Sequence, residues 1–289
     1  MIINSSYVGA QLKEYSTVID WQSIMYYAAS IGDDNTLYFN DQGRTVIAPP
    51  MFAVATTWPI TGNILEFLED KSFPTEVLKT QVHYTEHLIF HRPISAGENI
   101  VIKGSIAAIM KHHAGTVIVN RYNAYDNKGN PVFTEYIGGM IRGVQCTDSK
   151  GEENLPTIPK PLAQDQPIWE KQIYIDRMAP YIYEGCTGLA FPIHTSINFA
   201  KAVDLPDIIF HGTATLAFAV REITNSEADK DPTMIKEISC RFTGMVIPGS
   251  NIKIQLDGRT EREGGKDIFF KVLNDQNQKV ISGGYVRIE

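Results

Sequence analysis

The sequence has few cysteines and no long apolar run. Cys146, Cys186 and Cys240 are its three cysteines, and no pair of them has CxxC spacing, so a disulfide framework or a zinc ribbon is not indicated. No stretch approaches the roughly 18–20 apolar residues of a membrane-spanning helix. Residues 1–7 lack the basic and apolar segments of a secretory signal. We therefore expect a cytoplasmic protein without a membrane partner.

Excess positive charge is also missing. The chain has 33 acidic and 26 basic residues, which gives a net charge of −7. Because nucleic-acid binding requires clustered basic charge, nucleic acid is not an expected partner. A ligand with a few phosphates needs only a local basic patch and stays open. No GxGxxG, P-loop or HExxH motif occurs, so these nucleotide and metal sites are not predicted.

The first half of the chain reads as helices followed by strands. A strand is predicted near residues 15–19, and Asp20 is a suitable N-cap for the helix that follows. The apolar segment that begins near Ile47 predicts a second helix ended by Pro59, with further helix over residues 63–70. Segments rich in Val, Ile, Tyr and Thr, separated by turn signals, then predict four strands: 77–90, 99–110, 116–125 and 132–141.

The second half repeats this order after a segment rich in proline and charge. Residues 146–167 read as an extended, solvated linker. A strand at 168–175, an apolar helix and strands at 234–246, 251–256, 267–273 and 279–288 follow. Two landmarks recur, Ala96-Gly97 as Pro248-Gly249 and Gly138-Gly139 as Gly283-Gly284. We therefore predict a duplicated domain, with halves at 1–145 and 168–289.

Two histidines stand before the helix of the second half. Phe191-Pro192-Ile193-His194 has an irregular composition, and His211-Gly212 precedes an apolar run over residues 213–224 that lacks Gly and Pro. Such a run predicts a buried helix. The first turn of a helix carries free N–H groups and the positive end of its dipole. An imidazole near that end could act beside a carbonyl that those groups polarise.

This arrangement resembles the MaoC-like hydratase/dehydratase family, the R-specific enoyl-CoA hydratases. The family pattern is Gly-Asp-x-Asn-Pro-x-His, followed by His-Gly at the start of a central helix. The sequence matches it at Gly188, Pro192, His194, His211 and Gly212 and departs from it at two positions, where Leu189 replaces Asp and Phe191 replaces Asn. The resemblance covers nearly the whole chain. It implies an α+β double hot dog, in which two antiparallel sheets each wrap around a helix as a pseudo-dimer.

The resemblance also implies roles for the matched residues. His194 would be the general base toward water and the acid in the reverse direction. Gly212 would donate its backbone N–H to the thioester oxygen; the alternative is an ordinary glycine at a helix start. In the first half Pro50 aligns with Gly212 and has no N–H. We therefore expect that half to shape the pocket or hold the coenzyme.

Three other residues are candidates for the site, and two of them, Asp33 and Glu184, carry a carboxylate. Asp33 and Asn35 match the family's catalytic pair in the first half, where Tyr38 replaces the histidine. The preferred interpretation is that they pin a turn, as Asp and Asn commonly do; the alternative is that Asp33 reaches His194 across the pseudo-dimer. Glu184, just upstream of His194, could replace the lost carboxylate.

The remaining histidines do not indicate a metal. His83, His87 and His91 share parity on a predicted strand and would face one side, but four residues of strand span about 13 Å, too far for one ion. Ordinary packing is the preferred interpretation. Lys111, at the start of a small basic turn, lies on a segment that reads as a solvated hairpin.

These observations predict a hydratase or dehydratase that interconverts an enoyl thioester and a 3-hydroxyacyl thioester of CoA. No cofactor is expected beyond CoA as part of the substrate. Leu189 and Phe191 suggest an apolar pocket for a bulky acyl group. The alternatives are a silent acyl-CoA-binding subunit and a hot-dog thioesterase that uses Glu184 or Asp33. We expect a homodimer or a hetero-oligomer with a homologous subunit.

Overall fold

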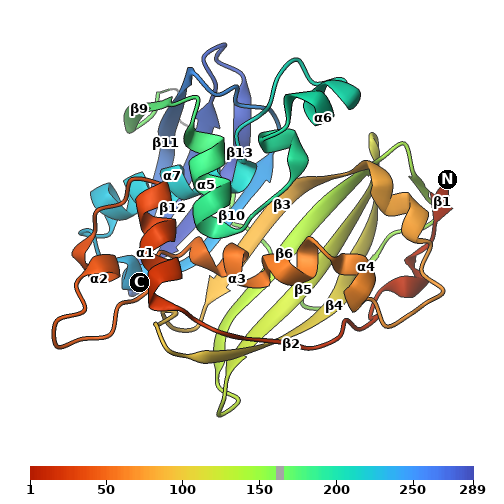
Figure 1. Ribbon diagram of the computed structural model, residues 1–289, viewed down its shortest axis with the longest axis horizontal. Coiled ribbons are helices and arrows are strands. Elements are labelled where there is room, and N and C mark those ends of the chain that lie inside the picture. Colours follow the sequence, from red (N-terminus) through yellow and green to blue (C-terminus); the bar gives the residue numbers. More distant parts are fainter. Residues whose placement is uncertain (161–165) are drawn as a thin grey trace.

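The long strands of the protein join into one continuous sheet (Figure 1). The computed structural model describes residues 1–160 and 166–289. The sheet has 11 strands, in the order β2–β4–β5–β6–β3–β10–β13–β12–β11–β9, with β8 paired to β4. Their bounds are β2 Tyr15–Val18, β3 Gln81–Phe90, β4 Asn99–His112, β5 Gly115–Asp126, β6 Pro131–Arg142, β8 Lys150–Gly151, β9 Trp169–Ile175, β10 Ile235–Phe242, β11 Ser250–Arg262, β12 Gly265–Leu273 and β13 Lys279–Ile288. A separate parallel pair joins β1 (Ile2–Ile3) to β7 (Gln145–Cys146).

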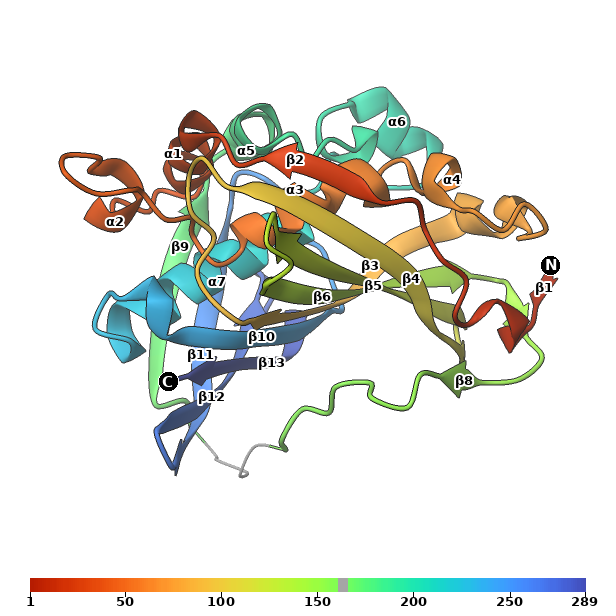
Figure 2. The ribbon, with the colours of Figure 1, turned by 90° about the horizontal axis from the view of Figure 1, so that it is seen from below.

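Helices lie on the concave side of this sheet. Figure 2 shows α3 and α7 against the strands, with α1, α5 and α6 outside them. The bounds are α1 Trp21–Ser30, α2 Thr36–Phe39, α3 Phe52–Thr61, α4 Ile64–Phe67, α5 Ala179–Thr187, α6 Ile197–Ala202 and α7 Gly212–Glu227; the 3₁₀ turns are η1 Ser5–Tyr7, η2 Thr75–Thr80, η3 Pro192–His194 and η4 Pro232–Met234. Two helix-on-sheet units therefore stand side by side, and the predicted double hot dog is confirmed.

The central helix α7 is longer than predicted. It runs over 16 residues from Gly212, and it buries Leu216, Val220 and Ile223 at helical spacing. This periodic face packs into the core. The predicted cap of α1 is also confirmed, because the Asp20 carboxylate accepts a hydrogen bond from the backbone N–H of Ser23 at 2.9 Å.

Two predicted helix boundaries in the first half were wrong. Pro59 lies inside α3 rather than ending it. Proline has no backbone N–H, so the helix lacks one hydrogen bond, the one from position 59 to the carbonyl four residues earlier. Because Pro59 lies in the last turn, α3 still continues to Thr61. Of residues 63–70 only α4 is helical, because Leu68 is extended and forms a bridge with Leu12. The predicted strand at 77–90 likewise starts later, since residues 75–80 form η2.

The pairing of β3 with β10 joins the two halves. Their register is antiparallel and runs from Glu237 opposite Ile89 to Arg241 opposite Thr85. The antiparallel sheets of the two units are therefore continuous across this edge. Strand edges carry unpaired N–H and C=O groups, and pairing two edges satisfies both.

A register shift in β3 redistributes its histidines. The pairing of β3 with β6 slips between His83 and Thr85, which turns His83 to the concave side with Glu86. His87 lies on the other face, beside Tyr136 and 2.6 Å from a Glu237 carboxylate oxygen. The prediction that these histidines share a face was wrong, because a bulge breaks the two-residue alternation. Within the described residues no group of three or more His, Cys, Asp or Glu could hold a metal ion.

The segment between the halves is partly attached to the sheet. Within the predicted linker, β8 pairs with Ala108 and Ile109 of β4, and Leu155 packs against the apolar cluster of the outer face. The prediction of a fully solvated linker was wrong for these residues. Residues 161–165 of the predicted linker lie outside the described residues. None of the described helices combines the length and apolarity that crossing a membrane requires.

One buried carboxylate ties the end of α7 to three strands. Glu227 accepts hydrogen bonds from Trp169 Nε1 at 2.9 Å, from Arg259 Nη2 at 2.6 Å and from Lys266 Nζ at 3.3 Å. Its side chain is only 2% exposed. Removing the carboxylate would leave Trp169 and the two charged partners, Arg259 and Lys266, without this acceptor.

We predict that Glu227→Gln lowers the free energy of unfolding by about 2–3 kcal/mol, because the charged hydrogen bonds to Arg259 and Lys266 weaken. Urea unfolding followed by circular dichroism measures this. Glu263→Gln, an exposed change in the β11–β12 turn, is the control and should leave the midpoint unchanged. Equal midpoints for both variants would contradict the anchoring role.

Candidate active site

His194 occupies a short 3₁₀ turn, η3, beside the start of α7. Its Nδ1 lies 2.8 Å from the backbone oxygen of Ile209. A carbonyl oxygen only accepts, so Nδ1–H donates and Nε2 keeps a free lone pair. Burial lowers the pKa of His194 to about 4. The imidazole is therefore uncharged at neutral pH and presents Nε2 as a base.

His211 stacks on His194. The ring centroids are 3.7 Å apart with an interplanar angle of 24°. His211 Nε2–H donates to the backbone oxygen of Leu189 at 3.1 Å, and Nδ1 has no hydrogen-bond partner among the described residues. Burial, and then the charge of His194, lower the pKa of His211 far below its usual range. The sequence pattern assigns His211 only to the His-Gly motif, whereas in the structure its imidazole stacks directly on His194.

Gly212 opens α7 next to this histidine pair. The N-cap residue His211 provides no side-chain cap, so the first-turn N–H groups are not occupied by it. A Cβ on Gly212 would lie 3.0 Å from Cδ1 of Phe242. The glycine thus lets the β10 side chain approach the helix start closely. The structure brings His194 to the start of α7, as the motif spacing predicted.

Glu184 holds the loop that carries His194. It comes from α5, and its carboxylate accepts from Thr195 Oγ1 at 3.2 Å and from the backbone N–H of Phe191 at 3.4 Å. One carboxylate oxygen lies 3.7 Å from His211 Nε2. A carboxylate therefore faces the histidine pair, although it reaches His211 rather than His194.

The two departures from the family pattern do not form a common apolar wall. Leu189 is a buried core residue, whereas Phe191 is 43% exposed and packs its ring edge-on against Phe199. The prediction of a bulky-acyl pocket built from these two side chains is therefore not supported. At position 189 the backbone oxygen, rather than a side chain, holds His211.

Asp33 and Asn35 lie elsewhere, toward the far end of α7. Asn35 caps α2 by accepting from the N–H of Leu37, and its amide donates to the backbone oxygen of Lys230 at 2.6 Å. Asp33 is buried beside Asn35, and burial raises the pKa of its carboxyl to about 6. The hypothesis that Asp33 reaches His194 was wrong. Both side chains pin the turn between α1 and α2, because short Asp and Asn side chains bond readily to nearby backbone N–H groups.

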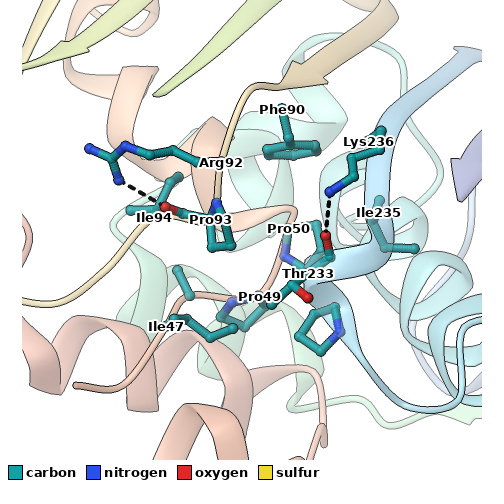
Figure 3. Close-up of a pocket in the computed structure, with 12 residues that line it drawn as sticks. Ile47, Pro49, Pro50, Phe90, Arg92, Pro93, Ile94, Thr233, Ile235 and Lys236 are labelled. Carbon is teal, nitrogen blue, oxygen red and sulfur yellow. Dashed lines mark hydrogen bonds between the residues drawn. The ribbon is translucent and has the colours of Figure 1, made fainter. Parts of the chain in front are cut away.

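Prolines occupy the corresponding position in the first half. A small pocket there is lined by Pro49, Pro50, Phe90, Arg92 and Lys236 among others. Figure 3 shows Phe90 above Pro50, with Arg92 and Lys236 at opposite sides. Lys236 Nζ donates to the backbone oxygen of Thr233 at 2.8 Å. Pro50 cannot donate to a carbonyl, so the first half has no backbone N–H at the position that aligns with Gly212.

Two family models match successive parts of the chain. Residues 161–282 match the MaoC like domain, and residues 6–135 match the FAS1-like, dehydratase domain region.

Known proteins resemble the chain over nearly its full length. It is 23% identical over 296 residues to enoyl-CoA hydratase 2, peroxisomal, of Arabidopsis thaliana, which covers 96% of this chain and 93% of that protein. It is 24% identical over 282 residues to peroxisomal multifunctional enzyme type 2 of Drosophila melanogaster, of which it spans 45%. The crystal structure of a MaoC-like dehydratase from Phytophthora capsici has a TM-score of 0.84 at 19% identity and covers 98% of this chain and 96% of its own. At this identity the structure shows a shared fold.

We predict that His194 stays neutral from about pH 5.5 to 8, with its proton on Nδ1, because burial disfavours the imidazolium. Nitrogen-15 spectra of labelled histidine measure the tautomer and its titration. The His194→Gln variant assigns the signal by its loss. A midpoint near the ordinary value of about 6.5 would contradict the buried, Ile209-bound imidazole.

Proposed function

Because the chain belongs to the MaoC-like dehydratase family, we propose that it interconverts a 2-enoyl thioester and a 3-hydroxyacyl thioester of CoA. The observation that carries the proposal is the uncharged His194 beside the start of α7, with Nδ1 bound to Ile209. One base and one set of backbone donors are what addition of water to a conjugated thioester requires.

In the proposed reaction His194 is the only residue that carries a proton. His194 Nε2 takes a proton from water as the water oxygen bonds to the β-carbon. The electron pair of the double bond moves toward the thioester oxygen, which the N–H of Gly212 stabilises. The imidazolium then returns its proton to the α-carbon, and one water has been added. Dehydration follows these steps in reverse.

Glu184 compensates for the charge that His194 gains. A positive charge on one ring of a stacked pair repels charge on the other, and the Glu184 carboxylate 3.7 Å from His211 Nε2 offsets this. The carboxylate also fixes the loop through Thr195 and Phe191. We assign Glu184 to positioning and charge stabilisation. The first half contributes no second oxyanion site of this kind, because Pro50, just before α3, has no N–H. The chemistry needs no cofactor beyond the CoA of the substrate.

His194→Ala should lower kcat for crotonyl-CoA hydration by roughly 10²–10⁴-fold, the usual contribution of one acid/base group. Loss of the conjugated thioester absorbance measures hydration, and a thiol reagent measures CoA release in the same samples. His91→Ala, on an exposed loop position, is the control.

The two readouts separate the alternatives. Hydration without thiol release supports a hydratase. Thiol release would instead indicate a thioesterase, and binding of the acyl-CoA with neither reaction would indicate a silent subunit. Unchanged hydration in His194→Ala would remove the proposed base.

Glu184→Ala should lower kcat/KM by roughly tenfold or more, because one charged hydrogen bond contributes about 1.5–3 kcal/mol. Glu184→Gln keeps acceptors for Thr195 and Phe191 but removes the charge. If the two variants are equally impaired, the charge is what matters; if only Glu184→Ala is impaired, the loop contacts matter. No loss in either would contradict both roles.

A further inference from the structure

Helix α6 exposes its large apolar side chains and buries a small one. Ala200 is the residue that it turns into the protein, whereas Ile197, Phe199 and the C-cap residue Val203 are 38–49% exposed. A surface helix of a globular protein normally has the opposite pattern, because large apolar side chains contribute most when they are removed from water. The pattern of α6 therefore indicates that something outside this chain covers it.

The apolar exposure continues onto the neighbouring elements. Phe191, the N-cap residue of η3, packs edge-on against Phe199 with ring centroids 6.1 Å apart. Helix α5 buries Tyr183 on one side and exposes Tyr181 and Ile182 on the other. The exposed apolar surface thus extends from α6 across η3 to α5.

Helix α1 of the first half extends the same surface. It packs on α5 through Tyr27 and Tyr183, whose ring centroids are 5.9 Å apart. Trp21 and Tyr26 of α1 are about half exposed. Helix α5 lies between α1 and α6 in both ribbon views (Figure 1, Figure 2). We call the outward side chains of α1, α5 and α6 named above, together with Phe191 and Val203, the helix face.

The helix face has the area of one side of a stable interface. Each of its eight large apolar side chains is 38–52% exposed. Side chains of this size have about 150–250 Å² of surface each, so the face presents roughly 800 Å². One partner contributes about 800 Å² to a protein–protein interface of standard size. An apolar surface this large is uncommon on a protein that stays monomeric.

The helix face carries little charge. The charged residues of α1, α5 and α6 are Glu184 and Lys201, and Asp204 and Asp207 follow α6. An anionic membrane attracts clusters of Lys and Arg, and an acidic protein would also need a basic face. In a twofold interface the same patch meets itself, so a face with few charges brings few like charges together. The composition therefore favours a second copy of this chain as the cover.

We propose that two copies of the protein pair through the helix face about a twofold axis. The turn η3, which carries His194, lies between Phe191 and Ile197. The partner therefore covers the chain on both sides of this turn. The inference rests on the exposed side chains and does not depend on the proposed chemistry.

Sedimentation velocity over a range of protein concentrations tests the pairing. We expect a species of twice the 32.3 kDa of one chain at about 10 μM, because interfaces of this size have micromolar or tighter affinities. Ile197→Glu on α6 and Tyr26→Glu on α1 should each raise the dissociation constant of the dimer at least about tenfold, since pairing would bury an unpaired charge. Ile168→Glu, at an exposed apolar residue just before β9, is the control and should leave the constant unchanged. Circular dichroism checks that each variant is folded.

Hydrogen exchange of the unaltered protein locates the interface without any variant. Amides of residues 179–187 and 197–203 should exchange more slowly at concentrations where the dimer forms. A protein that stays monomeric at about 50 μM would overturn the inference. A dimer whose dissociation constant is unchanged in both variants, or whose formation leaves this exchange unchanged, would place the interface elsewhere and overturn it too. A monomer that sediments with vesicles of phosphatidylcholine and phosphatidylserine would assign the helix face to a membrane instead.

Discussion

The antiparallel pairing of β3 with β10 is the contact on which the site depends. It closes the edges of two half-sheets against each other over the register from Glu237–Ile89 to Arg241–Thr85, so that no edge is left open between them. It also sets side chains of the first half behind the helix start of the second. His83 reaches Phe242, and through it Gly212, only because these two strands are neighbours. Side chains of the first half therefore pack against the element that borders the start of α7.

The two halves differ at the aligned position near the start of their central helices, where one has Pro50 and the other has Gly212. Phe90 and Pro50 line the same pocket in one half, and Phe242 closely approaches Gly212 in the other. Pro50 precedes Met51, the N-cap of α3, and the helix begins at Phe52, so the missing N–H of Pro50 removes no hydrogen bond within the helix. The first half can thus lose a donor for a bound carbonyl and keep its helix α3. The loss affects chemistry and not folding.

The sequence was sufficient for elements that depend on local patterning. Most strands, the start of α7 and the Asp20 cap follow from alternation, helical spacing and side-chain chemistry. The shift at His83 did not, because a bulge depends on the partner strand β6. The hypothesis that Asp33 reaches His194 was wrong for a similar reason. A motif match gives no position relative to Arg221 and Lys230, residues almost 200 positions away that hold the turn. The presence of His211 in the site could have been predicted from the sequence, because the His-Gly step is part of the motif.

In the proposed reaction, the site has to stabilise a charged His194 without the aspartate of the family pattern, because Leu189 stands at that position. A base with a pKa lowered by burial holds a proton poorly, so an imidazolium at His194 is high in energy and returns its proton readily to the α-carbon. What such a site requires is brief stabilisation of that cation. The Glu184 carboxylate lies 3.7 Å from Nε2 of the stacked His211. The backbone oxygen of Ile209 orients the ring of His194, and that of Leu189 orients the ring of His211. In the proposed reaction, backbone oxygens thus orient the two imidazoles, and the charge of Glu184 in α5 offsets the charge that His194 gains.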